Sequence, residues 1–309
     1  MATLLYTHRS SEEHDTGYGH PERSDRIRFV RRALDTPGFA ALDRREAPEA
    51  TIEQIARVHR RDYVTALLEA VPERGYVRVD PDTTMSPASG DAALHAVGAT
   101  IAAVDAVLAG EGVNAFCAVR PPGHHAEPGR GMGFCLFNNV AIAAAHARAV
   151  HGVERVAIVD FDVHHGNGTQ SAFWSDPSVL YASSHEYPFY PGSGAEDEVG
   201  QGNIFNVPLA SNSGSAEFRR GLERVVLPAL ERFKPGLVIV SAGFDAHARD
   251  PLASIRLDEE DFAWITRKLV DIAGEACDGR IVSSLEGGYD LDALSSSVSA
   301  HVAELMKAA

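Results

Sequence analysis

The densest group of reactive side chains follows an apolar run, in the segment Val156-Ala-Ile-Val-Asp160-Phe-Asp162-Val-His164. Side chains two residues apart on a strand point to the same side, so Asp160, Asp162 and His164 should share one face. The Cα atoms of Asp162 and His164 would lie about 6.6 Å apart, close enough to bind one ion. Buried carboxylates need a compensating charge, and a metal ion is the simplest one. Asp160 lies one pleat further back, where it would support the ligands by hydrogen bonding.

A third metal ligand must come from another part of the chain, and Asp245 in Ser241-Ala-Gly-Phe-Asp245 is the outstanding candidate. Gly243 would let the backbone turn sharply just before it. Three protein ligands leave one coordination position open for water, which is the arrangement of catalytic zinc sites. A bound divalent ion can lower the pKa of that water to about 7 and polarise a carbonyl. Asp162, His164 and Asp245 therefore predict a catalytic metal site.

Two adjacent histidines could move protons beside such a metal. His124 and His125 follow the rigid turn Arg120-Pro-Pro-Gly. One imidazole could carry the proton while its neighbour tunes the local charge. Each needs a partner on its far nitrogen, and we expect Asp160 to serve one and Asn167 the other.

A tyrosine could assist from the opposite side. Tyr289 lies in Glu286-Gly-Gly-Tyr289, where two glycines free the loop to bring the phenol over the metal. A hydroxyl aimed at a developing oxyanion would stabilise it.

The elements that position these residues follow from short apolar runs that alternate with amphipathic stretches from about residue 90 onward. The capping pair Asp258 and Asp261 marks one helix start. The alternation predicts a mostly parallel sheet with helices on both faces. No linker divides the chain, so we expect one domain over residues 1–309. The expected strands are 114–119, 155–159, 179–183, 237–242 and 280–285, and the expected helices are 92–109, 138–150, 216–233 and 259–276.

The reactive residues fall just past the carboxyl ends of these five strands, which is where open α/β sheets bind ligands. In chain order they are His124 with His125, Asp162 with His164, His185, Asp245 with His247, and Tyr289.

The overall composition narrows the class of protein. The net charge of −15 argues against binding nucleic acid, which needs clustered Lys and Arg. Three cysteines in apolar settings suit a reducing compartment, and we expect the cytoplasm. The first residues carry no signal-peptide pattern, and we expect no membrane-spanning run. No coiled-coil heptad or apolar patch predicts an oligomer.

The motifs resemble those of the zinc-dependent histone deacetylase family, and within it the class II-like bacterial amidohydrolases. They cover nearly the whole chain in the family's order: His20-Pro-Glu-Arg23, Arg120-Pro-Pro-Gly-His-His-Ala126, Gly131-Met-Gly-Phe-Cys-Leu-Phe-Asn-Asn139, Val159-Asp-Phe-Asp-Val-His-His-Gly-Asn-Gly-Thr-Gln170, Tyr190-Pro-Gly-Ser-Gly194, Ser241-Ala-Gly-Phe-Asp245 and Leu285-Glu-Gly-Gly-Tyr289.

This resemblance implies a single arginase–deacetylase-type α/β domain with a central parallel sheet of about eight strands. It implies one zinc ion on Asp162, His164 and Asp245. By the family's mechanism His125 is the general base and acid, and His124 is its electrostatic companion, paired to Asp160. Asn167 stands where some relatives carry Asp. Tyr289 would polarise the carbonyl, and relatives with His at that position are weak deacetylases.

The resemblance also implies structural potassium and a substrate channel. An inner potassium site would use Asp160, Ser183 and the backbone carbonyls of Asp162, His164 and Ser184. A second, peripheral site would fall around Phe173, Asp176 and Val179. The channel would hold a lysine-like stem beside Gly133, with Phe134 and either Phe189 or Tyr190 as walls and Leu252 near the rim.

The expected reaction is hydrolysis of an N-acetyl or other N-acyl amide to a carboxylate and a primary amine. The substrate could be acetyl-lysine in a peptide or protein, an acetylpolyamine, or another small acylated amine. Polyamine specialists can carry an acidic residue at the channel rim, where this chain has Leu252, although Asp80, Asp82 or Glu127 could supply the charge. A dimanganese ureohydrolase and a non-catalytic acyl-amine binder are the remaining alternatives.

Overall fold

Eight parallel strands form the central sheet of the structure, a computed structural model that describes residues 2–309. Their spatial order is β2-β1-β5-β10-β9-β6-β7-β8. Parallel strands buried on both faces read as continuous apolar runs, which is the pattern of the central five. The strands are β1 (Thr3–Thr7), β2 (Asp43–Glu46), β5 (Asn114–Cys117), β6 (Val156–Asp160), β7 (Val179–Glu186), β8 (Ile204–Leu209), β9 (Leu237–Ala242) and β10 (Ile281–Leu285).

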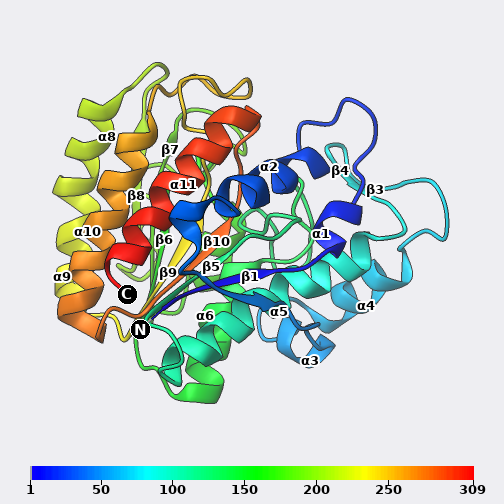
Figure 1. Ribbon diagram of the computed structural model, residues 1–309, viewed down its shortest axis with the longest axis horizontal. Coiled ribbons are helices and arrows are strands. Elements are labelled where there is room, and N and C mark those ends of the chain that lie inside the picture. Colours follow the sequence, from blue (N-terminus) through cyan, green and yellow to red (C-terminus); the bar gives the residue numbers. More distant parts are fainter. Residues whose placement is uncertain (1) are drawn as a thin grey trace.

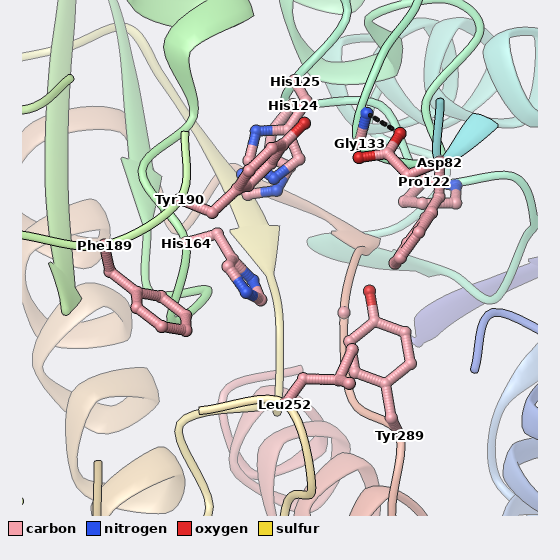
Figure 2. A pocket seen from close by; sticks show the side chains of 12 residues that line it. Asp82, Pro122, His124, His125, Gly133, His164, Phe189, Tyr190, Leu252 and Tyr289 are labelled. Atoms are coloured by element: carbon pink, nitrogen blue, oxygen red, sulfur yellow. Dashed lines mark hydrogen bonds between the residues drawn. The ribbon is translucent and has the colours of Figure 1, made fainter. Parts of the chain in front are cut away.

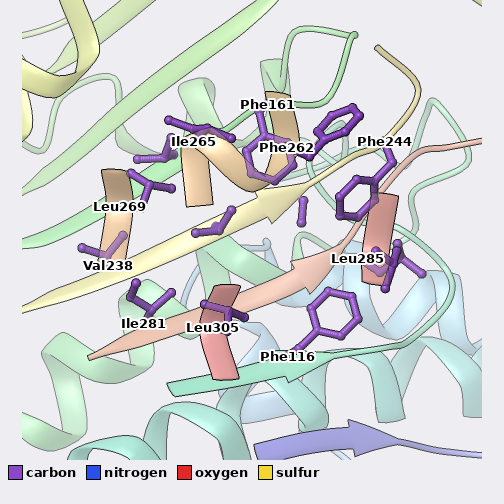
Figure 3. Close-up of a cluster of buried hydrophobic side chains, with 14 of the residues drawn as sticks. Phe116, Phe161, Val238, Phe244, Phe262, Ile265, Leu269, Ile281, Leu285 and Leu305 are labelled. Carbon is purple, nitrogen blue, oxygen red and sulfur yellow. The ribbon is translucent and has the colours of Figure 1, made fainter. Parts of the chain in front are cut away.

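Helices cover both faces of this sheet, as the sequence predicts (Figure 1). On one face Phe116, Phe161, Phe244 and Phe262 form the centre of a large apolar cluster (Figure 3). The helices that contribute to this cluster are α2 (Ser24–Leu34), α8 (Ser215–Gly221), α9 (Leu227–Phe233), α10 (Glu259–Cys277) and α11 (Leu291–Lys307). The other face packs against α5 (Ser89–Leu108), α6 (Asn139–His151) and α7 (Asn167–Phe173).

The first ninety residues supply elements that the hydrophobic pattern does not predict. β1 and the charged edge strand β2 extend the sheet, and a two-stranded antiparallel sheet, β3 (Val77–Asp80) with β4 (Thr83–Met85), lies outside it. The short elements are α1 (Ser10–Glu13), a 3₁₀ turn at Pro37–Phe39, α3 (Ile52–Ile55) and α4 (Arg61–Glu69). Of these, α1 and α3 span four residues each, which is too short to show a helical period, whereas α4 spans nine.

Two sequence expectations need correction. The helix expected over 216–233 is interrupted by a π-helical turn, Leu222–Val226, between α8 and α9. Pro228 follows it, and proline cannot donate the backbone hydrogen bond that a continuous α-helix requires there. The second concerns α5, which is long and apolar enough to cross a membrane by length and composition, contrary to expectation. Of its most apolar stretch 67% is buried inside the fold, as in the core helix of a globular protein.

The carboxyl end of β6 lies at the centre of the sheet edge where the reactive residues gather. The strand ends at Asp160, four residues before His164, although the sequence pattern predicts that Asp160, Asp162 and His164 lie on one strand. Phe161 and Val163 still enter the apolar cluster, while Asp162 and His164 turn to the opposite side. In contrast, β7 continues to Glu186, so His185 lies within the strand.

Candidate active site

Asp162, His164 and Asp245 converge at this edge, with one ligand atom from each within 4.8 Å of the others. The Nδ1 atom of His164 lies 3.2 Å from Oδ1 of Asp162 and 3.1 Å from Oδ2 of Asp245. The second carboxylate oxygens are held by backbone amides. Gly287 N–H donates to Asp162 Oδ2 at 2.8 Å, and Val163 N–H donates to Asp245 Oδ1 at 2.9 Å. One oxygen of each carboxylate is thereby left facing the common point.

The charges at this point require a cation. Asp160, Asp162 and Asp245 are all buried, and among residues 2–309 their only ion-pair partners are histidines. Burial lowers the pKa of His164, but its hydrogen bonds to Asp162 and Asp245 outweigh that effect and raise the pKa to about 10. A proton on His164 therefore carries the positive charge that a divalent ion would bring. Two carboxylate oxygens and an imidazole nitrogen suit zinc, whose binding displaces that proton.

Two other groups of possible ligands in residues 2–309 are less suited to a catalytic ion. They are His8 with Asp91 and His95, and Asp105 with His146 and His151, and each includes an exposed residue. The group formed by Asp162, His164 and Asp245 is the fully buried one.

His124 and His125 lie beside the proposed ligands and reach the partners expected from the sequence. His124 Nδ1 is 3.0 Å from Asp160 Oδ2, and His125 Nδ1 is 2.8 Å from Asn167 Oδ1. Burial lowers the pKa of His124, but the charges of Asp160 and Asp162 raise it to about 10. Burial and the positive charge of His124 hold the pKa of His125 well below 6.5. The pair therefore combines a charged and a neutral imidazole at neutral pH.

Tyr289 is fixed by groups behind it. Its backbone N–H donates to Asp250 Oδ2 at 2.7 Å, and the Arg26 guanidinium lies 4.9 Å from its ring centre. Arg26 also donates to the carbonyl of Gly288 at 2.6 Å. Burial raises the pKa of Tyr289 well above its usual value, which keeps the hydroxyl protonated as a hydrogen-bond donor.

A cavity of about 200 Å³ leads to these groups. Its inner part is lined by the two histidines, His164 and Tyr289, and Figure 2 shows the Tyr289 hydroxyl directed toward its interior. The volume is small beside the roughly 300–1,000 Å³ of pockets that take drug-sized ligands. All the residues expected to line a channel do line it: Gly133, Phe134, Phe189, Tyr190 and Leu252.

The family model of the histone deacetylase domain matches residues 20–305 of this chain. This chain belongs to the histone deacetylase family. It is 44% identical over 277 residues to a histone deacetylase-like amidohydrolase of Pseudomonas aeruginosa, and the match covers 88% of this chain and 73% of that protein. It is 39% identical over 318 residues to the chloroplastic histone deacetylase 10 of Oryza sativa, covering 96% and 72%.

A solved structure extends this relationship to the whole fold. The crystal structure of the HDA15 HD domain superposes with a TM-score of 0.93 at 36% identity, covering 99% of this chain and 88% of that one. Together with the eight-stranded parallel sheet, this similarity confirms the arginase–deacetylase-type fold that the motifs of this histone deacetylase family member predict.

Not every strand end contributes to the cavity. His185 bonds to Ser183 Oγ at 2.8 Å and to the Gly194 carbonyl at 2.8 Å, away from the cavity lining. His247 lies 3.6 Å from Glu259. Neither His185 after β7 nor Asp245 and His247 after β9 line the cavity, although Asp245 joins the buried group with Asp162 and His164.

The two potassium sites implied by the resemblance differ in the structure. At the inner position, Asp160 and Ser183 are register partners on β6 and β7, and Ser184 beside them is buried. At the peripheral position, the carbonyls of Phe173, Asp176 and Val179 do converge. They accept from Asn203 Nδ2 at 2.9, 3.1 and 2.8 Å. An amide donor thus occupies the centre where the resemblance implies a cation.

Sequence reasoning missed several residues that support the site. Glu286 is buried and accepts from the backbone of Gly123 at 2.6 Å and of His124 at 3.2 Å, so it fixes the histidine turn. Burial raises the pKa of Glu286 to about 7. Its place in Leu285-Glu-Gly-Gly was a usable signal, whereas nothing in the sequence indicated that Arg26 reaches Gly288.

Three histidines of the first ninety residues join structural contacts. His14 bonds to Ser89 at 2.7 Å and His59 accepts from the Asn138 backbone at 2.8 Å. His20 packs edge-on against Phe134 at 4.7 Å between ring centres, so it supports a channel wall.

Proposed function

We propose that this protein is a zinc-dependent deacetylase that hydrolyses the N-acetyl amides of lysine-like primary amines and releases acetate. The observation that carries this proposal is the buried group Asp162, His164 and Asp245 at the inner end of a narrow channel, facing the Tyr289 hydroxyl. The apolar side chains of Phe134 and Phe189 suit an aliphatic stem, and the polar groups are confined to the inner end.

Zinc bound there would activate a water molecule and polarise the acetyl carbonyl. The protein's own groups complete the reaction. His125, with its Nε2 atom unprotonated, accepts the proton of the attacking water and later donates a proton to the leaving amine. Tyr289 donates a hydrogen bond to the carbonyl oxygen as negative charge develops on it. His124, held charged by Asp160, keeps His125 neutral and adds positive charge to the inner end of the channel.

The ligand set supports one zinc ion rather than the manganese pair of a ureohydrolase. Two adjacent metal ions need additional carboxylates around the same point. Here Asn167 stands at one nearby position and His125 binds its amide oxygen instead of a metal. The presence of Tyr289 and of all three ligands supports an enzyme rather than a non-catalytic acyl-amine binder.

An acetylpolyamine is the second candidate substrate, and one observation favours it. Asp82 lines the cavity and forms no ion pair within residues 2–309, so its carboxylate is available to a distal ammonium. Its Oδ1 atom accepts from Gly133 N–H at 3.0 Å. Leu252, on the same lining, offers no charge. We therefore place acetyl-lysine peptides first and acetylpolyamines second.

Three further properties belong to the proposal. The single inner potassium site, at Asp160 and Ser183, is supported by their strand register and by the burial of both residues. A reducing compartment such as the cytoplasm is supported by three free, buried cysteines. A single domain over residues 1–309 is supported by one sheet that joins Thr3 to Leu285.

A substrate panel tests the proposal. Acetyl-lysine peptides, acetylputrescine, acetylspermidine and longer acyl-lysine peptides are assayed by amine release, with a chelator-treated sample of the same enzyme as control. We expect the highest kcat/KM for acetyl-lysine peptides and loss of turnover on chelation. No hydrolysis of any of these amides by zinc-loaded protein would contradict the deacetylase function.

A further inference from the structure

We infer that Glu127 is a positioning residue that fixes the side-chain amide of Asn167 and, through it, the tautomer of His125. The inference rests on the proposed function, because it assigns a purpose to that tautomer. The contact in question joins Glu127 to the side chain of Asn167, which in turn contacts His125 as expected. Asn167 Nδ2 donates to Glu127 Oε1 at 2.9 Å, while Asn167 Oδ1 faces His125 Nδ1 at 2.8 Å.

The surroundings of the Asn167 amide distinguish its two ends. Its nitrogen lies 3.4 Å from the His125 carbonyl and 3.4 Å from Met132 Sδ, in addition to Glu127. All three neighbours are acceptors, of which the Glu127 carboxylate is the strongest. A flipped amide would place its oxygen against the Glu127 carboxylate, where two acceptors repel each other. Glu127 therefore holds the amide oxygen toward His125.

The orientation matters because an amide oxygen only accepts and an amide nitrogen only donates. With Oδ1 facing it, His125 Nδ1 must carry the proton, and Nε2 keeps its lone pair for proton abstraction. A flipped amide would donate to Nδ1 and move the ring proton to Nε2, the wrong tautomer for a base. A carboxylate at position 167 would not need this control, because both of its oxygens accept.

Glu127 is placed to do this without touching the substrate. It does not line the cavity, and its backbone pairs with Arg130 across a tight turn, with N···O distances of 2.9 and 3.2 Å. Asn167 begins α7 and is buried. The carboxylate thus reaches the amide from behind, on the side away from the channel.

A double-mutant cycle tests the assignment. Glu127→Ala should lower kcat about tenfold with KM unchanged, since it removes one charge-assisted hydrogen bond that orients the base. Glu127→Gln should retain most activity, because its amide oxygen can still accept from Asn167. In an Asn167→Asp background, Glu127→Ala should cause no further loss at that variant's pH optimum. Glu69→Ala, which removes an exposed carboxylate on α4, is the matched control and should match the parent.

Two outcomes would overturn the inference: unchanged kcat in Glu127→Ala, or the same loss in both backgrounds. A readout independent of turnover keeps it testable if the parent hydrolyses none of the amides, an outcome that would count against the proposed function alone. The ¹⁵N shifts of the imidazole, assigned by comparison with His125→Ala, report the tautomer. We expect His125 to carry its proton on Nδ1 in the zinc-loaded parent and to lose that preference in Glu127→Ala. The same tautomer in both proteins would refute the role.

Discussion

The rings of His124 and His125 lie 4.0 Å apart at their centres, yet their Nδ1 atoms face different partners. His124 faces the carboxylate of Asp160, and His125 faces the amide oxygen of Asn167. A carboxylate stabilises an imidazolium far more than an amide does. The two neighbouring imidazoles on this turn therefore differ in charge. His124 is positively charged, and His125 is neutral and free to accept a proton.

The pH profile should report this difference. His125 acts as a base only when neutral, and its pKa is held well below 6.5. We therefore expect kcat/KM to stay level as the pH falls through 6.5 and to decline only at lower pH. Asn167→Asp places a negative charge beside the ring and favours the imidazolium, so the acidic limb should move to higher pH by about one unit or more. An acidic limb at the same pH in both enzymes would contradict this assignment.

Tyr289→Phe should lower kcat by about a hundredfold, because it removes one hydrogen bond to the developing oxyanion. Zinc content should stay equal to that of the parent, since Tyr289 is not a ligand. Metal analysis and steady-state kinetics on the same preparation separate the two effects. Turnover at the parent rate would show that the phenol does not act on the carbonyl.

Asp245→Asn should abolish zinc retention and turnover together. The amide cannot replace the charged oxygen that faces His164, and its nitrogen would point toward the metal or toward Val163 N–H. Asp91→Asn is the matched control, because Asp91 is the exposed member of another group of possible ligands, with His8 and His95. That control should keep one zinc per chain, as measured after dialysis. Zinc loss in the control alone would place the metal elsewhere.

The channel lining should decide between peptide and polyamine substrates. Leu252→Glu adds a carboxylate that can pair with a distal ammonium, so kcat/KM for acetylspermidine should rise about tenfold relative to an acetyl-lysine peptide. Asp82→Asn should change the ratio in the opposite direction, since it removes the existing charge. Ratios that do not respond to either change would mean that substrate charge is not sensed at these positions.

The sequence predicts the centre of this fold well and its periphery poorly. Four of the five central strands, β5, β6, β9 and β10, are buried apolar runs followed by residues of the site, so both their position and their chemical role can be inferred. The strand β2, Asp43-Arg-Arg-Glu46, is an exposed edge without such a pattern, and its pairing with Leu4 depends on the whole sheet. The local pattern also failed at Leu222–Val226, where a π-helical turn before Pro228 interrupts the expected helix.

The residues of the site likewise divide into those that the sequence predicts and those that it does not. Asp162, His164, Asp245 and the two histidines lie in motifs whose residue types and spacing are enough to suggest their chemistry. The contacts of Arg26 with Gly288 and of Glu127 with Asn167 join residues 262 and 40 positions apart. Neither belongs to a periodic pattern, so only the folded chain reveals them.

Titration of zinc into chelator-treated enzyme, with activity on an acetyl-lysine peptide measured at each step, tests the central claim most directly. We expect turnover to rise linearly and to saturate at one zinc per chain, with no recovery in Asp245→Asn. Full activity before any metal is added, or saturation only at two metal ions per chain, would contradict the single zinc site on Asp162, His164 and Asp245.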